Sequence, residues 1–171
     1  MIKLNIGSGN DYKPSYINID GCDILEKVDK IINFEEDSLL NYFEKDSVDF
    51  ILANDFIEHF YHWEAVKILS DFFQILKPKA KMEIRLPDVK FICSTFRMSI
   101  EEKITYLYGG QDINQGESKD NYRKKFPQFF CHKYGYTKKT MTKELSKIGF
   151  VQIITKSMHE NFIVNALKPS K

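Results

Sequence analysis

Short apolar runs separated by polar stretches make up the first third of the chain, and they predict β-strands. The runs are bounded by Gly, Pro, Asn or Asp, which is typical of short strands in a buried sheet. Asp37 and Ser38 open a brief helical turn that continues to Tyr42. The predicted strands of this region span residues 2–6, 16–20, 29–33 and 48–53.

The spacing of apolar residues changes to three and four after residue 60, which predicts a helix over residues 62–76. Lys77-Pro78 ends this helix, because proline cannot continue it. A strand over residues 81–86 follows, and Ser99-Ile100-Glu101-Glu102 has the spacing of a capping box. The helix that it starts ends at Gly109-Gly110.

The C-terminal part combines one helix with a hairpin. A helix is predicted from Thr137 to Ile148, with Gly149 just past its end. Residues 150–157 and 161–167 alternate in polarity around a His159-Glu160 turn, which predicts an antiparallel hairpin. Strands that alternate with helices favour an α/β fold with a doubly wound, mostly parallel sheet, here of seven strands. Residues 1–171 contain no repeat or linker and are interpreted as one domain.

Composition and cysteine content favour a cytoplasmic protein. No apolar run approaches the roughly 20 residues that cross a bilayer, and a strand begins almost at the first residue, without a leader. Cys22, Cys93 and Cys131 are odd in number and widely spaced, so we expect reduced thiols and no disulfide frame. Each is expected to be a small buried residue.

Charge is unevenly distributed along the chain. Residues 1–60 carry five Lys against thirteen Asp and Glu, whereas residues 119–139 carry seven Lys and Arg against one Asp. An acidic first third suits a cationic cofactor, and a basic, aromatic-rich insert suits an anionic acceptor. Both segments are equally explained as solvated faces of the protein.

The residues that indicate a ligand-binding site lie where the first two predicted strands end. Gly7-Ser8-Gly9 follows the first strand, and glycines there let the backbone approach a ligand where a Cβ would clash. Asp20 ends the second strand, where a carboxylate can accept the hydroxyls of a ribose. The arrangement therefore predicts a cofactor that contains a nucleoside.

A dinucleotide is disfavoured by the details of this motif. Its third glycine is missing, since position 12 is Tyr, and Asp20 comes 11 residues after Gly9, where the dinucleotide fingerprint has about 20. This interval is too short for a full helix, so the first helix is shortened or missing. Without a helix N-terminus to bind a pyrophosphate, the site suits S-adenosylmethionine (SAM), which has a ribose and no phosphate.

Several motifs along the chain occur in the order found in a known family. The chain resembles class I SAM-dependent methyltransferases in LNIGSG, YINID, VDFILANDFIEHF and LKPKAKMEIRLPD, and then in YGGQ, HKYGYT and LSKIGF. The resemblance is greatest to the short type-11-like members, which are often associated with the modification of polysaccharides or small molecules. It implies that the terminal hairpin adds one antiparallel strand to the sheet. LKPKAK departs from the usual LKPGG at Lys79 and Ala80, which affects a turn rather than the cofactor site.

Ligands of open parallel sheets bind beyond the carboxyl ends of the strands, which gives a set of candidate site residues. Asn33 and Phe34 end the third strand, where the resemblance implies an adenine site, although Phe34 is equally explained by core packing. Asp55 is a candidate general base or a helix cap, and Asp23 rivals Asp20 for the ribose. The predicted cofactor residues are Gly7, Ser8, Gly9, Asp20, Asn33, Phe34, Asn54 and Asp55.

Three histidines deserve separate consideration. His59 and His62, with Glu58, share a helical spacing that can bind metal, but no third ligand pattern is visible and no metal is expected. The resemblance implies that Glu58-His59 shapes the floor of the cofactor pocket. His132 lies in the segment 109–136, which is predicted to be a basic, aromatic lid. An imidazole there can accept a proton from the acceptor, or it can be part of an aromatic cluster.

The sequence therefore predicts a methyltransferase that binds SAM and releases S-adenosylhomocysteine, with His132 and Asp55 as candidate catalytic residues. A small anionic acceptor, such as a sugar or sugar phosphate, is the favoured substrate. The alternatives are an RNA or protein methyltransferase that docks through residues 119–139, a non-catalytic SAM-binding subunit, and an enzyme that uses NAD or a nucleotide sugar. The oligomeric state is left open.

Overall fold

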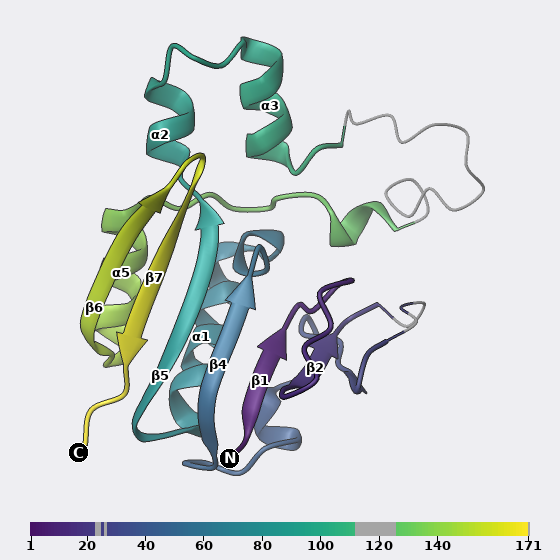
Figure 1. The fold of residues 1–171 in the computed structure, drawn as a ribbon, viewed down its shortest axis with the longest axis vertical. Helices are drawn as coiled ribbons and strands as arrows, with labels where there is room; N and C mark the ends of the chain where they lie inside the picture. Colours follow the sequence, from purple (N-terminus) through teal and green to yellow (C-terminus); the bar gives the residue numbers. More distant parts are fainter. Residues whose placement is uncertain (23–24, 26, 112–125, 171) are drawn as a thin grey trace.

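A seven-stranded sheet in the order β3-β2-β1-β4-β5-β7-β6 organises the chain in the computed structural model (Figure 1). The structure describes residues 1–22, 25, 27–111 and 126–170. Strands β1 to β5 pair in parallel, and β7 is antiparallel to both β5 and β6. The predicted α/β fold, with a mostly parallel sheet of seven strands and a C-terminal antiparallel hairpin, is confirmed. The strands are β1 (Lys3–Ile6), β2 (Ile17–Asp20), β3 (Lys30–Ile31), β4 (Val48–Asn54), β5 (Leu76–Pro87), β6 (Val151–Met158) and β7 (Asn161–Leu167).

The helices begin and end at the capping residues that the sequence indicates. Ser99 and Glu102 form a reciprocal capping box at the start of α3, which Gly109 ends in a left-handed conformation. Thr137 and Gly149 bound α5 in the same way. The α-helices are α1 (His62–Ile75), α2 (Val89–Ser94), α3 (Ile100–Tyr108) and α5 (Lys138–Ile148), and the 3-10 turns are η1 (Leu39–Asn41), η2 (Ile57–His59) and η3 (Pro127–Phe129).

Two predicted boundaries are wrong. The strand predicted over residues 81–86 begins at Leu76, directly after α1, and β3 is only two residues long. Pro78 is tolerated because β5 is irregular opposite β4 there, and Lys79 has a φ of 66°. The Lys79 N–H is bonded to the Lys168 carbonyl rather than to β4. α2, capped by Asp88, is too short to leave a periodic signal and is not predicted.

The apolar core lies between the sheet and the helices behind it in Figure 1. α1 packs on β5, and α5 packs on β6, β7 and α1. Parallel strands place alternate residues on this face. The side chains that meet there are fully or almost fully buried: Leu4, Ile6, Ile51, Ala53, Met82, Ile84, Phe162 and Val164 from the sheet, and Ala65, Leu69, Phe72, Met141 and Leu145 from the helices.

The opposite face of the sheet has no helical layer among the described residues (Figure 1). No helix lies between Ile6 and Ile17, so the first helix is missing, as predicted. The strand register places mixed rows on this face: Lys3, Phe50, Lys81 and Leu167 in one, and Asn5, Leu52, Glu83 and Asn165 in the next. Charged side chains at the centre of a parallel sheet are compatible with this arrangement because water reaches them.

The cysteines lie in less buried positions than predicted. Cys22, Cys93 and Cys131 are free thiols, which agrees with the absence of a disulfide frame. None is buried, however, and Cys93 is exposed because it lies on the outer side of the short helix α2. No described helix combines the length and the apolar composition that a membrane span requires.

Asp71 attaches η1 to α1 across the helical layer. Its carboxylate is 6% exposed, and Oδ2 accepts hydrogen bonds from Ser38 Oγ at 2.7 Å and from the Leu39 N–H at 3.0 Å. A buried carboxylate is stable only when such donors replace water. The contact fixes the path of the chain between β3 and β4.

Asp71→Ala is expected to lower the free energy of unfolding by about 2 kcal/mol, because it leaves a buried N–H and a hydroxyl without an acceptor. Asp71→Asn keeps one acceptor oxygen and should cost about half as much. Urea unfolding followed by circular dichroism measures both values. An alanine variant as stable as the wild type would contradict this role.

Candidate functional site

The turn after β1 places backbone atoms at the carboxyl edge of the sheet. Gly7 and Gly9 have φ angles of 65° and 48°, a left-handed conformation that glycine adopts without strain. A Cβ on Gly7 would lie 2.5 Å from a ring carbon of Phe56, whereas a Cβ on Gly9 would meet nothing within 4 Å. Gly7 therefore lets a core ring approach the turn, and Gly9 leaves space beside it.

Asp20 holds this turn against the end of β2. Its Oδ2 accepts the Gly9 N–H at 2.8 Å, and its Oδ1 accepts the Cys22 N–H at 3.0 Å. A carboxylate has about four acceptor positions, so two stay free for a ligand. Asp23, the alternative ribose residue, lies outside the described residues.

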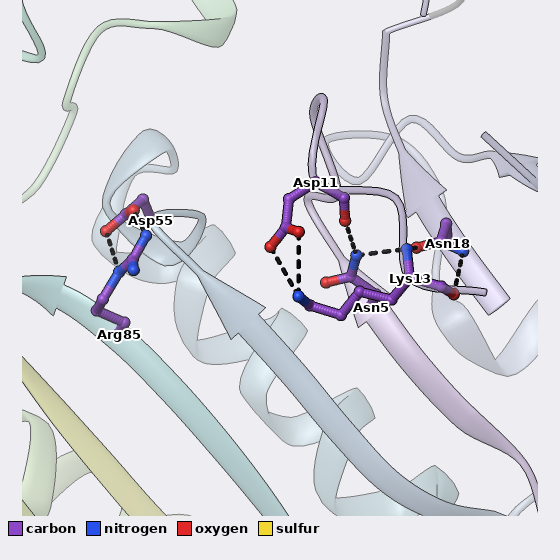
Figure 2. A network of polar contacts seen from close by, with 6 residues as sticks. All are labelled: Asn5, Asp11, Lys13, Asn18, Asp55 and Arg85. Carbon is purple, nitrogen blue, oxygen red and sulfur yellow. Dashed lines mark hydrogen bonds and ion pairs between the residues drawn. The ribbon is translucent and has the colours of Figure 1, made fainter. Parts of the chain in front are cut away.

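A polar network replaces the missing helix between β1 and β2 (Figure 2). Asn5 Nδ2 donates to the Asp11 carbonyl at 2.8 Å and to Asn18 Oδ1 at 2.9 Å. Asn18 Oδ1 also accepts the Lys13 N–H, and Asn18 Nδ2 donates to the Lys13 carbonyl. The N–H and amide groups of Asn18 donate to Asp29 and hold the pKa of that carboxyl below its ordinary value.

Phe34 is part of the core and also borders the site. It is 5% exposed, and its ring packs edge-to-face on Phe56 and Phe60, with centroids 4.9 and 6.2 Å away. Asn33 beside it is exposed, and its Oδ1 accepts the Glu35 N–H at 3.2 Å. The Phe34 ring therefore packs in the core with most of its surface and borders the site with the rest.

Asp55 is an ion-pair partner of Arg85 (Figure 2). The guanidinium bonds to both carboxylate oxygens, with Arg85 Nε 3.2 Å from Oδ1 and Nη2 in contact with Oδ2. The carboxylate in turn helps raise the pKa of Arg85. Asp55 has a φ of 49° and makes no side-chain cap to η2, whose N-cap is Phe56. The Asp55 side chain therefore forms an ion pair and does not cap a helix.

The side chain of Glu58 is buried beside the site. The residue is 2% exposed, and neither carboxyl oxygen has a hydrogen-bond partner in the part of the chain that the structure describes. Burial, with the charge of Asp55, raises the pKa of Glu58 to about 8, although Arg85 and the N–H groups of Phe56 and Glu58, which do not reach hydrogen-bonding geometry, oppose the shift. Such a group is costly to bury in its charged form.

Two histidines lie next to Glu58. Their rings, those of His59 and His132, pack edge-to-face with centroids 5.0 Å apart. Burial lowers the pKa of His59, and burial together with the neighbouring His59 lowers the pKa of His132 to about 4. His59 Nδ1 lies 3.1 Å from the Cys131 carbonyl. His62 lies apart from this pair and packs on Tyr134, with ring centroids 4.7 Å apart.

A cavity of about 1150 Å³ collects most of these residues at the carboxyl edge of the sheet. Both candidate catalytic residues, Asp55 and His132, line it. Ser8 and Asn54 do not: Ser8 is buried behind the turn, and Asn54 precedes the residue that reaches the cavity. The predicted cofactor residues that line it are Gly7, Gly9, Asp20, Asn33, Phe34 and Asp55.

The far side of the cavity comes from the predicted lid. Of the segment 109–136, the structure describes residues 109–111 and 126–136. Gly109, Gly110, Phe126, Phe129 and Phe130 line the cavity together with Thr105 and Tyr106 of α3. The described lid is aromatic where it faces the cavity. Its Lys133 is instead paired with Glu35 and lies 5.1 Å from the Tyr61 ring centroid.

Sequence reasoning did not find Arg85, Phe56 or Tyr106 as site residues. Arg85 could have been found, because it lies near the carboxyl end of a predicted strand, as Asp55 does. Tyr106 carries no such signal, since α3 reaches the cavity only through its tertiary position.

Comparison with known proteins identifies the fold. No family model and no curated protein matches the sequence. Among solved structures, the carbon methyltransferase CurJ matches with a TM-score of 0.63 and 16% identity over 99% of this chain and 49% of its own. A SAM-dependent methyltransferase from Methanosarcina mazei matches with a TM-score of 0.63 and 17% identity, over 99% and 92% of the two chains.

A third structure contains the cofactor. Phosphoethanolamine N-methyltransferase 2 of Haemonchus contortus, in complex with SAM, matches with a TM-score of 0.60 and 14% identity over 99% of this chain and 49% of its own. The chain thus spans about half the length of CurJ and of the Haemonchus enzyme. It has the Rossmann-like fold of SAM-dependent methyltransferases, as the sequence motifs imply.

Gly7→Ala is expected to lower the free energy of unfolding by about 3 kcal/mol, because the methyl group meets Phe56 and the left-handed backbone is strained. Gly9→Ala is the matched control, with the same backbone penalty and no contact, and should cost about 1 kcal/mol. Urea unfolding measures both. Equal losses would show that Phe56 moves away freely.

Proposed function

We propose that this chain is a SAM-dependent methyltransferase that transfers a methyl group to a small, anionic acceptor, with sugars and sugar phosphates as the favoured class. The observation that carries the proposal is the position of Asp20. Its carboxylate borders a large cavity at the carboxyl edge of a methyltransferase-like sheet, next to the Gly7–Gly9 turn. This is where open α/β sheets bind nucleoside ligands.

The cofactor is assigned to the strand ends. Asp20 accepts the two ribose hydroxyls with the acceptor positions that the Gly9 and Cys22 amides leave free. Gly9, with open space beside it, lets the ligand approach the backbone. Asn33 and the exposed edge of Phe34 border the adenine, and Asp55 borders the methionine part. Ser8 and Asn54 support the turn and strand end rather than the ligand.

The missing helix supports SAM over a dinucleotide. A pyrophosphate is normally bound by the N-terminal amides of the helix that follows the first strand. Here the polar network of Asn5 and Asn18 occupies that stretch of chain, and its amides bond within the loop. SAM carries no phosphate and does not need them.

The acceptor is assigned to the space under the lid. His132 and Tyr106 border it beyond Asp55, so we place the reacting atom of the acceptor beside His132. Asp55 is held by Arg85, and we assign to it the positioning of ligands rather than proton transfer. Methyl transfer depends mainly on such alignment of donor and acceptor.

Two observations favour a small acceptor over a nucleic acid. Of the three lysines in the described part of the basic segment, Lys133 pairs with Glu35 and Lys138 with Asp88, and Lys139 is exposed on α5, so most of the described positive charge is paired with carboxylates. The aromatic lid residues Phe129 and Phe130 line a cavity rather than a flat surface. The Haemonchus enzyme of the same fold is named for phosphoethanolamine, a small phosphorylated acceptor.

SAM and S-adenosylhomocysteine are expected to raise the melting temperature of the protein, whereas NAD and UDP-glucose should leave it unchanged. Asp20→Ala removes two charge-assisted hydrogen bonds to the ribose and should weaken S-adenosylhomocysteine binding about 100-fold, measured by isothermal titration calorimetry.

Asp37→Ala is the matched control, since it removes the same charge from the acidic first third but lies outside the cavity, bonded to Tyr42. It should change the affinity less than about twofold. Stabilisation by NAD, or equal losses in the two variants, would reject the cofactor assignment.

A further inference from the structure

The buried Glu58, the ring of His59 and the ring of His132 form a cluster that the cofactor site does not use. One possible ligand atom from each residue lies within 4.8 Å of the other two. We propose that Glu58, His59 and His132 bind a divalent first-row transition-metal ion at the wall of the cavity. The site is built by two segments distant in sequence, because η2 supplies Glu58 and His59, whereas the lid supplies His132.

The first argument is the unpartnered carboxyl group of Glu58. It is almost completely buried, and neither of its oxygens has a hydrogen-bond partner among the described residues. The nearby cation Arg85 is bonded to both carboxylate oxygens of Asp55 instead. Buried carboxylates are normally paired or coordinate a metal ion. A bound cation would therefore satisfy a group that the surrounding protein leaves unsatisfied.

The second argument is the orientation of the imidazoles. Histidines that bind metal usually donate their second ring N–H to a carbonyl or carboxylate, which fixes the tautomer. His59 Nδ1 has such a partner in the Cys131 carbonyl at 3.1 Å. The backbone of Tyr106 and Leu107 lies near the His132 ring and acts to raise its pKa, against the effect of burial. With Nδ1 on the Cys131 carbonyl, Nε2 is the His59 nitrogen that we assign as a ligand.

The third argument is the type and openness of the ligand set. Two imidazoles and one carboxylate on one side of an ion are typical of sites for Fe²⁺, Co²⁺ or Zn²⁺ with open positions. His59 and His132 both line the large cavity, so these positions would face it. Metal–ligand distances near 2.1 Å place tetrahedral ligand atoms about 3.4 Å apart, so binding draws the ligand atoms, now within 4.8 Å of one another, together by up to about 1.4 Å.

The site has a consequence that rests on the proposed function. An ion with open positions beside the acceptor space can bind an acceptor hydroxyl and lower its pKa, so that the proton passes to solvent. The resulting oxygen then forms the bond to the methyl carbon as the bond from that carbon to sulfur breaks. His132 acts in this scheme as a ligand and not as a free base.

The test uses the full chain after treatment with a chelator. Titration with Co²⁺, followed by visible absorption, should show one saturable site, and Zn²⁺ should compete for it. Glu58→Gln and His132→Gln should each weaken Co²⁺ binding by at least about 30-fold. His62→Gln is the matched control, since His62 packs on Tyr134 outside the cluster, and it should leave binding unchanged.

Melting temperature and S-adenosylhomocysteine affinity are measured for every variant, which separates unfolding from the loss of a ligand. A wild-type chain without saturable Co²⁺ binding overturns the proposal, as does equal binding by the wild type, Glu58→Gln and His132→Gln. If the protein binds S-adenosylhomocysteine but no metal, this inference fails and the methyltransferase assignment stands. If it binds metal but no S-adenosylhomocysteine, the methyltransferase assignment fails.

Discussion

The hydrogen bonds of one carboxylate fix the geometry on which the rest of the site depends. Asp20 joins the turn after β1 to the chain that leaves β2, through the N–H groups of Gly9 and Cys22. This link adds to the hydrogen bond from the Ser8 N–H to the Ile19 carbonyl, in a stretch of chain where the helix that usually follows β1 in this type of fold is missing. The same carboxylate faces the cavity, so the support of the turn and the proposed contact with the cofactor are inseparable.

Asn18 supplies some of the backbone hydrogen bonds that a helix would otherwise supply in this stretch of chain. A helix satisfies its own backbone groups, whereas an irregular loop must find partners for each of them. The side chain of Asn18 provides several at once, since its oxygen accepts from Lys13 and Asn5 and its amide donates to the Lys13 and Tyr16 carbonyls. The hydrogen bonds of one buried asparagine thereby stabilise the stretch of chain in which a helix of ten or more residues would otherwise lie.

Local signals made much of the fold and part of the site predictable. Capping residues, strand alternation and the Gly7–Gly9 turn depend on neighbours in the sequence, and their predictions are confirmed as elements of the fold. The cavity lining differs from the predicted cofactor residues at two positions, since Ser8 and Asn54 flank the cavity without lining it. The approach of His132 to Glu58 was not predicted, because it depends on the tertiary path of the lid, fixed by bonds from Lys133 and Tyr134 to the Glu58 carbonyl.

The face of the sheet that no described helix covers has a consequence for how the sequence of this chain can vary during evolution. A strand covered by helices on both sides must keep nearly every position apolar, whereas on this face, among the described residues, some positions of β5 are open to water. Lys81 and Glu83 occupy such positions in the middle of β5. These two positions are therefore free to vary in charge without loss of core packing, whereas Asn5 and Asn18 on the same face are buried and hold the loop between β1 and β2.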